Sequence, residues 1–129
     1  ELWIADAGGR SPRRLLAPRP HPDPQRNLTG FNTLAFSPDG RMLYFLSQAW
    51  ATSNALHRIA LAGGEPVYLG AANNVQVVPR GHYAGYLVVQ RHKYFKGGGS
   101  HEPYCLLTPG GREVRELGDD ERALEALLR

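Results

Sequence analysis

The sequence predicts an all-β fold of four-stranded antiparallel units, about two and a half of them, with a short C-terminal helix. Three observations support this class. A Gly-Gly pair follows a short apolar segment at residues 8–9, 63–64 and 110–111. The pairs lie roughly 50 residues apart, a period typical of four-stranded propeller blades. Gly and Pro, 15 and 10 of the 129 residues, cluster between segments of strand length. We therefore expect a single propeller-like domain over residues 1–129.

The first element is a hairpin over residues 2–16. Leu2 to Ala5 form a short apolar segment, and Leu15 and Leu16 end the returning one. Gly8-Gly9 between them can adopt the positive φ that a tight turn needs. Residues 17–30 follow with four prolines and two arginines, which predicts an extended loop with polyproline character.

The first complete blade is expected over residues 31–69. Two strand-like segments, 31–36 and 41–47, flank the turn Ser-Pro-Asp-Gly at 37–40, whose proline fixes φ and whose glycine closes the turn. The returning segment 42–46 is apolar at every position, so we expect both its faces to be covered. Two further strands around the second Gly-Gly pair complete the blade.

The second blade is expected over residues 74–117, with a longer turn at 79–85 in place of Ser-Pro-Asp-Gly. Residues 91–103 form a long connection with a glycine run. At residues 119–129 acidic residues precede Leu124, Leu127 and Leu128 at helical spacing, which predicts a short amphipathic helix.

The composition excludes several classes of protein. With 15 Lys and Arg against 12 Asp and Glu, the net charge is only +3, which permits contact with nucleic acid or phospholipid but does not require it. We expect no nucleic-acid partner. No apolar run approaches the length of a membrane span. Cys105 is the only cysteine, so an intrachain disulfide is impossible. No cofactor is predicted.

Residues 36–47, Phe-Ser-Pro-Asp-Gly-Arg-Met-Leu-Tyr-Phe-Leu-Ser, resemble the signature W/F-S-P-D-G-[KR]-x-[IL]-x-F-x-S of TolB-like β-propeller repeats. The Gly-Gly hairpins resemble the outer strand pair of the same blades, and this weaker pattern extends over residues 2–117. Pro-Arg-Gly-His at 79–82 replaces the usual turn, so the second blade departs from the family pattern.

The resemblance implies a non-catalytic binding module of the bacterial envelope, periplasmic or secreted. A closed ring of four blades needs on the order of 160 residues or more, so we expect a partial or open propeller. Because the chain begins at Glu1 rather than Met, we also expect that an upstream segment has been removed. Exposed edge strands of open blades favour self-association.

The candidate binding surface is the connection 91–103, where basic and aromatic side chains cluster. Aromatic faces stack on flat ligands, and cations bind carboxylates or phosphates. The wider aromatic and basic cluster also includes Tyr83, Tyr86, Phe95 and Tyr104, and we expect at least half of the cluster to pack between the sheets. The predicted surface, with a protein as the expected partner, consists of Arg91, His92, Lys93, Tyr94, Lys96 and His101.

No catalytic or metal site is predicted, and we expect that the chain is not an enzyme. Ser100 adjoins His101, but a flexible glycine run does not hold a nucleophile and its base in fixed geometry. The spacings of His82, His92, His101 and Cys105 match no familiar zinc template.

Two other functions stay open at this point. The chain could be the propeller of a prolyl-oligopeptidase-like hydrolase, which a downstream Gly-x-Ser-x-Gly segment in the gene would reveal. It could also be a carbohydrate-binding module that uses exposed aromatics, in which case Tyr94→Ala should abolish glycan binding.

Overall fold

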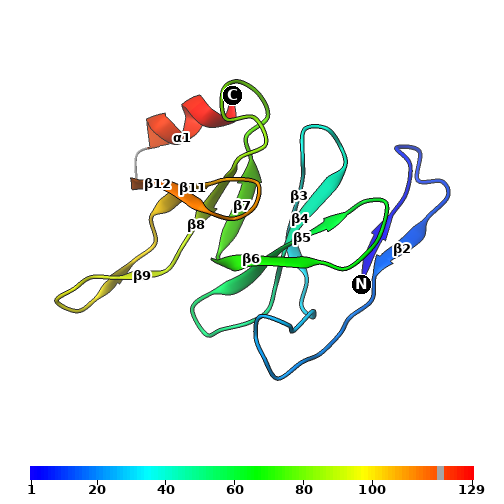
Figure 1. The fold of residues 1–129 in the computed structure, drawn as a ribbon, viewed down its shortest axis with the longest axis horizontal. Helices are drawn as coiled ribbons and strands as arrows, with labels where there is room; N and C mark the ends of the chain where they lie inside the picture. Colours follow the sequence, from blue (N-terminus) through cyan, green and yellow to red (C-terminus); the bar gives the residue numbers. More distant parts are fainter. Residues whose placement is uncertain (119–120) are drawn as a thin grey trace.

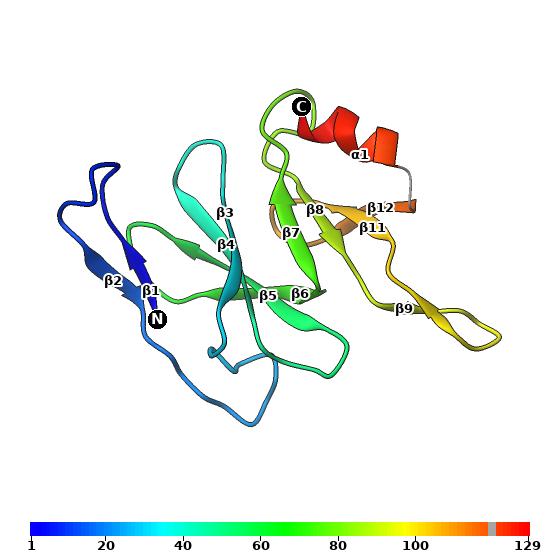
Figure 2. The same ribbon diagram turned by 180° about the vertical axis from the view of Figure 1, so that it is seen from behind.

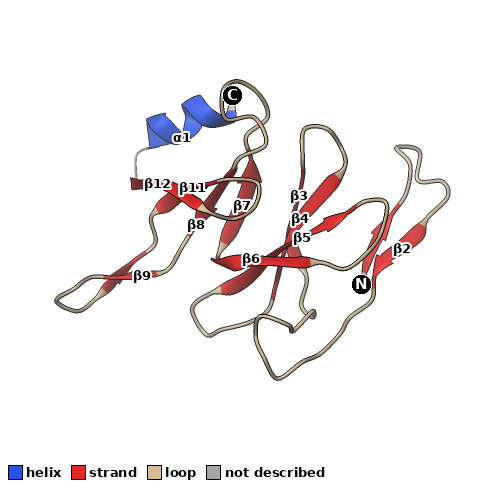
Figure 3. Cartoon of the chain, in the orientation of Figure 1, coloured by secondary structure: helices blue, strands red, loops and turns tan. Residues whose placement is uncertain are grey.

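The computed structural model describes residues 1–118 and 121–129 and shows antiparallel β-sheets with one short helix (Figure 1). The predicted all-β class is confirmed. The N-terminal hairpin, two four-stranded sheets and the helix follow one another across the molecule, and Figure 2 shows the same order from behind. Figure 3 shows the loops between the strands, the longest of which precedes β3.

Each four-stranded sheet is an antiparallel meander, interrupted in the second sheet by a small separate hairpin between β8 and β11. The hairpin pairs β1 (Leu2–Ile4) with β2 (Arg13–Leu16). The first sheet, in the order β3-β4-β5-β6, contains Asn32–Phe36, Met42–Ser47, Asn54–Ala60 and Val67–Ala72. The second sheet, in the order β12-β11-β8-β7, contains Glu113–Gly118, Tyr104–Leu107, Leu87–Gln90 and Asn74–Val77.

Strand β4 is covered on both faces, as its apolar sequence predicts. Successive side chains of a strand point to opposite sides of the sheet. Leu43 and Phe45 accordingly pack toward the N-terminal hairpin, whereas Tyr44 and Leu46 pack toward the second sheet. All four are buried. Burial of a large apolar side chain contributes roughly 1.5–3 kcal/mol, so β4 anchors the layers on both its sides.

Three apolar clusters join neighbouring layers. The first lies between the hairpin with its following loop and the first sheet, the second between the two sheets, and the third between the second sheet and α1 (Glu121–Leu128). The buried members of the first cluster are Leu2, Leu16, Leu28, Leu43, Phe45 and Ile59. Those of the second are Tyr44, Leu46, Leu56, Ala72, Val75, Leu87, Val89, Cys105 and Leu107. Those of the third are Val78, Val88 and Leu106. The core is therefore divided among the layer interfaces.

The Ser-Pro-Asp-Gly turn has the predicted conformation. The Gly40 N–H donates to the Ser37 carbonyl at 2.9 Å, and Gly40 has a φ of 71°. The Asp39 carboxylate accepts from the Ser37 hydroxyl at 2.6 Å and from the Arg41 N–H at 2.9 Å. These bonds, that of the Ser37 hydroxyl first, hold the pKa of Asp39 below its usual value. The Asp39 carboxylate thus has a structural role, which is to hold the turn together.

The C-terminal helix α1 lies within the range predicted for it. Its Leu124, Leu127 and Leu128 pack toward the second sheet, as the apolar spacing predicts. The acidic residues Asp119 and Asp120 of the predicted helix start lie outside the described residues. Among the described residues no helix is long and apolar enough to cross a membrane.

Two segments expected to be loops contain strand pairing. In the Pro-rich loop, Arg19 and Leu28 form an antiparallel bridge, so the segment folds back on itself. In the connection 91–103, β9 (Lys93–Tyr94) pairs with β10 (Ser100–His101). Prolines and glycines conceal both pairings in the sequence because strands are normally poor in them.

Candidate functional site

The predicted binding residues lie on a β-hairpin arm, defined here as residues 91–103, that projects from the second sheet between β8 and β11 (Figure 2). Strands β9 and β10 form the arm, and a glycine turn closes it. There the Phe95 N–H donates to the Gly99 carbonyl at 3.0 Å, and the Gly98 N–H donates to the Phe95 carbonyl at 3.1 Å. The arm is therefore an ordered hairpin.

Arg91 and Lys93 are neutralised at the base of the arm. Arg91 pairs with Glu113 at 3.1 Å and donates to the Ala71 carbonyl of the first sheet at 3.2 Å. Lys93 pairs with Glu113 at 3.0 Å and with Glu116 at 3.1 Å. These two cations therefore tie the arm to β12 and to β6 and have little charge left for a ligand.

The protonation of this network follows from its contacts. Burial alone would lower the pKa of Lys93, but its bonds to Glu113 and Glu116 outweigh that effect and raise the pKa. Burial would raise the pKa of Glu113, but its bonds, that from Lys93 first, lower it. Both groups stay charged at neutral pH, so the base of the arm is held by full ion pairs.

The two histidines of the predicted surface also have protein partners. His92 Nδ1 lies 3.3 Å from Glu102 Oε1, and His101 Nε2 lies 3.6 Å from Glu116 Oε1. The His101 ring stacks on Phe95 with 4.2 Å between centroids. No group of three or more His, Cys, Asp or Glu in the described part of the chain is arranged to hold a metal ion.

The end of the arm presents three exposed side chains. Tyr94 is 74% exposed and Phe95 is 54% exposed. Lys96 is exposed and has no partner among the described residues. We call Tyr94, Phe95 and Lys96 the arm tip. Phe95 is absent from the predicted set, although it stands between two of its members in the sequence.

The other aromatics of the neighbourhood have a structural role. Tyr83, Tyr86 and Tyr104 pack against the cluster beneath α1. Tyr83 and Tyr86 contact each other edge to face at 5.2 Å. The structure therefore separates the aromatic residues into a packed group and the exposed pair of the arm tip.

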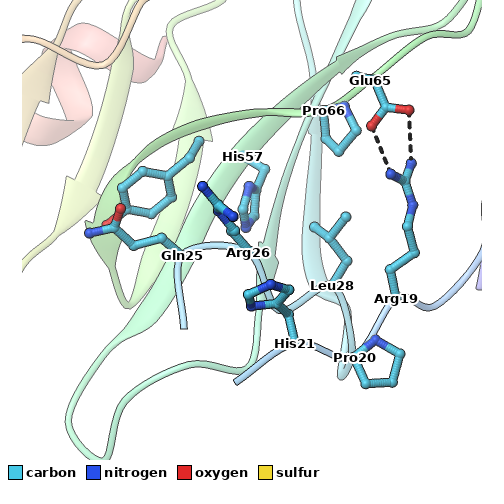
Figure 4. Close-up of a pocket in the computed structure, with 10 residues that line it drawn as sticks. Arg19, Pro20, His21, Gln25, Arg26, Leu28, His57, Glu65 and Pro66 are labelled. Carbon is cyan, nitrogen blue, oxygen red and sulfur yellow. Dashed lines mark hydrogen bonds and ion pairs between the residues drawn. The ribbon is translucent and has the colours of Figure 1, made fainter. Parts of the chain in front are cut away.

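A pocket, separate from the arm, lies on the first sheet beneath the Pro-rich loop (Figure 4). We call it the loop pocket. It has a volume of about 530 Å³. Its lining residues come from the loop, from β5, from the turn between β5 and β6, and from β6. They are Arg19, Pro20, His21, Gln25, Arg26, Leu28, His57, Glu65, Pro66 and Tyr68. The sequence gives no signal for this pocket because its two sides lie about 40 residues apart in the chain.

A buried polar pair lies beside the loop pocket. His57 Nε2 and the Ser47 hydroxyl are 3.0 Å apart across β4 and β5, and both residues are buried. The His57 ring stacks on Phe45 and meets Tyr68 edge to face. Burial lowers the pKa of His57 from 6.5 to about 4. This imidazole is therefore neutral at physiological pH.

Comparison of the chain with protein-family models, with curated proteins and with solved structures finds no match. The resemblance of residues 36–47 to TolB-like repeats therefore stays a prediction from the sequence.

Proposed function

We propose that the chain is a non-catalytic interaction module that binds a protein partner through the arm tip. The observation that carries this proposal is an exposed aromatic pair, Tyr94 and Phe95, at the end of an ordered projecting hairpin. Aromatic side chains are enriched in protein interfaces and contribute much of their binding energy.

The base of the arm supports this function. The ion pairs of Arg91 and Lys93 with Glu113 and Glu116 order the arm before a partner arrives. Preorganisation reduces the entropy lost on binding. Lys96, which has no partner among the described residues, favours a partner with an acidic residue at the edge of its binding surface.

The layer order supports a propeller-like arrangement as part of the same proposal. Two successive four-stranded meanders pack through one shared apolar cluster, as adjacent blades do. The Ser-Pro-Asp-Gly turn lies between the first two strands of the first sheet. We assign the chain to a periplasmic or secreted setting on the resemblance to TolB-like repeats.

The test compares the wild-type chain with a Tyr94→Ser/Phe95→Ser variant. Each is immobilised and exposed to an extract of the source cells, and captured proteins are identified by mass spectrometry. A protein that the wild type captures and the double variant does not is then purified and titrated against both chains. We expect the double variant to weaken its affinity at least tenfold, because two aromatic anchors are lost.

Trp3→Ser is the matched control, because Trp3 is 59% exposed but lies on the N-terminal hairpin. It should bind like the wild type. Thermal denaturation of all variants verifies that they fold. The proposal fails if every captured protein binds the double variant as well as the wild type, or if the arm tip binds only glycans on an array.

A further inference from the structure

The loop pocket has the size and lining of a small-molecule site. Its volume of about 530 Å³ lies within the range of ligand pockets, roughly 300–1,000 Å³. Three of its lining residues carry rings: Tyr68, Pro20 and Pro66. Such walls suit a planar ligand, since planar rings stack on aromatic and proline faces.

His57 provides a hydrogen-bond donor to this pocket. Ser47 is fully buried, and His57 Nε2 is the only partner of its hydroxyl in the described part of the chain. The hydroxyl proton is satisfied only if Ser47 donates it to Nε2. The proton of the neutral ring then lies on Nδ1. The His57 Nδ1 atom has no hydrogen-bond partner among the described residues. It is not fully buried, so a ligand in the pocket can reach it.

His21 is held in a donor state by a separate contact. Its Nδ1 accepts the backbone N–H of Asp23 at 2.9 Å. A ring that accepts at Nδ1 carries its proton on Nε2. Nε2 has no partner among the residues that the structure describes. The pocket therefore receives imidazole N–H donors from opposite sides, from the loop and from β5.

The charges around the pocket leave one cation without a close counterion. Arg19 and Glu65 neutralise each other, with nitrogen-to-oxygen distances of 2.7 and 3.4 Å. Arg26 has only a distant contact with Asp23, at 3.8 Å. In Figure 4 the guanidinium of Arg26 and the rings of His21 and His57 point toward the same part of the pocket. The contact with Asp23 is made by Nε, and the terminal nitrogens of Arg26 have no partner among the described residues. A guanidinium with open terminal nitrogens beside two imidazole donors suits a carboxylate ligand.

We propose that the loop pocket binds a small planar aromatic monocarboxylate. The ring lies against the faces of Tyr68, Pro20 and Pro66. The carboxylate accepts from the Arg26 guanidinium and from the imidazole N–H groups of His21 and His57. A phosphate dianion fits less well, because Arg26 is the one lining cation without a close partner in the described residues.

The test uses naphthalene-2-carboxylate as the probe, measured by isothermal titration calorimetry with the full chain. The neutral naphthalene-2-carboxamide and the non-aromatic cyclohexanecarboxylate are the comparison compounds. We expect saturable binding of the aromatic carboxylate, at least tenfold tighter than that of either comparison compound. Its addition should shift the imidazole NMR signals of His21 and His57.

Arg26→Gln should weaken binding of the probe at least tenfold. Arg26 is 74% exposed, so this change is expected to leave the fold intact. Arg80→Gln, on an exposed residue outside the pocket, is the matched control and should bind like the wild type. The proposal is overturned if the probe does not saturate, if the carboxamide binds equally well, or if Arg26→Gln and Arg80→Gln behave alike.

Discussion

His57 makes the stability of the protein depend on pH. Well above pH 6.5 the ring is neutral in both the folded and the unfolded chain and contributes no pH dependence. Burial lowers its folded pKa to about 4. As the pH falls from 6.5 toward 4, the unfolded chain binds a proton that the folded chain excludes. We therefore predict that the free energy of unfolding decreases over this interval by up to about 3 kcal/mol.

Urea unfolding of the wild type and of His57→Gln at about pH 7 and about pH 4.5 measures this effect. Glutamine can still accept the Ser47 hydroxyl but does not titrate. The difference in stability between the two pH values should be smaller in the variant, since the carboxylates titrate alike in both proteins. Equal differences would assign the acid sensitivity to other groups.

Cys105 should be chemically inert in the folded protein. The residue is fully buried, and this burial raises the pKa of its thiol to about 11. A thiolate is the reactive form of cysteine. We predict that a thiol reagent such as DTNB modifies Cys105 only after unfolding in urea. Rapid modification of the native chain would show that the interface between the two sheets opens readily.

The turn between β11 and β12 couples the second sheet to the first. Gly111 has a φ of 93°, and a Cβ there would lie 2.7 Å from the Leu69 carbonyl oxygen and 2.9 Å from the Leu69 Cβ. We predict that Gly111→Ala lowers the free energy of unfolding by about 1–3 kcal/mol, through backbone strain and displacement of β6.

Gly110→Ala is its matched control. The nearest atom to a Cβ at Gly110 is Thr108 Oγ1, at 3.8 Å, and the residue has no positive φ. Its substitution should change stability by less than about 0.5 kcal/mol. Urea denaturation of both variants gives the comparison. Equal effects would indicate that the turn does not bear on Leu69.

Elements specified by local sequence were predictable, and those that depend on distant residues were not. The turn at 37–40 follows from its own proline and glycine, and β4 follows from its unbroken apolar run. The predicted site residues do lie together on one arm, but Glu113 and Glu116 neutralise two of them from β12. The loop pocket needs the sheet to bring Glu65 to Arg19, a proximity that no local pattern encodes.

At the scale of the whole molecule, β3 is an exposed edge. It pairs only with β4 among the described strands, and its Leu34 and Phe36 are 55% and 58% exposed. Apolar edge strands favour pairing with another chain. We predict that the protein self-associates as its concentration rises, and that Phe36→Lys reduces this association by placing a charge on the edge.

Light scattering across a concentration series measures the effect. Tyr94→Lys places the same charge on the arm tip and should leave the association unchanged. A monomer at every concentration would contradict the prediction. Loss of association in Tyr94→Lys alone would place the contact on the arm.

The layered core has a consequence for how the molecule opens. Each apolar cluster joins neighbouring layers. The hairpin and α1, as the outer layers, are each held by one cluster, whereas each four-stranded sheet is held by two. Opening should therefore begin at the outer layers and proceed inward. Amide hydrogen exchange would then form a gradient along the stack, fastest in β1 and α1 and slowest at Phe45, Leu46 and Val89.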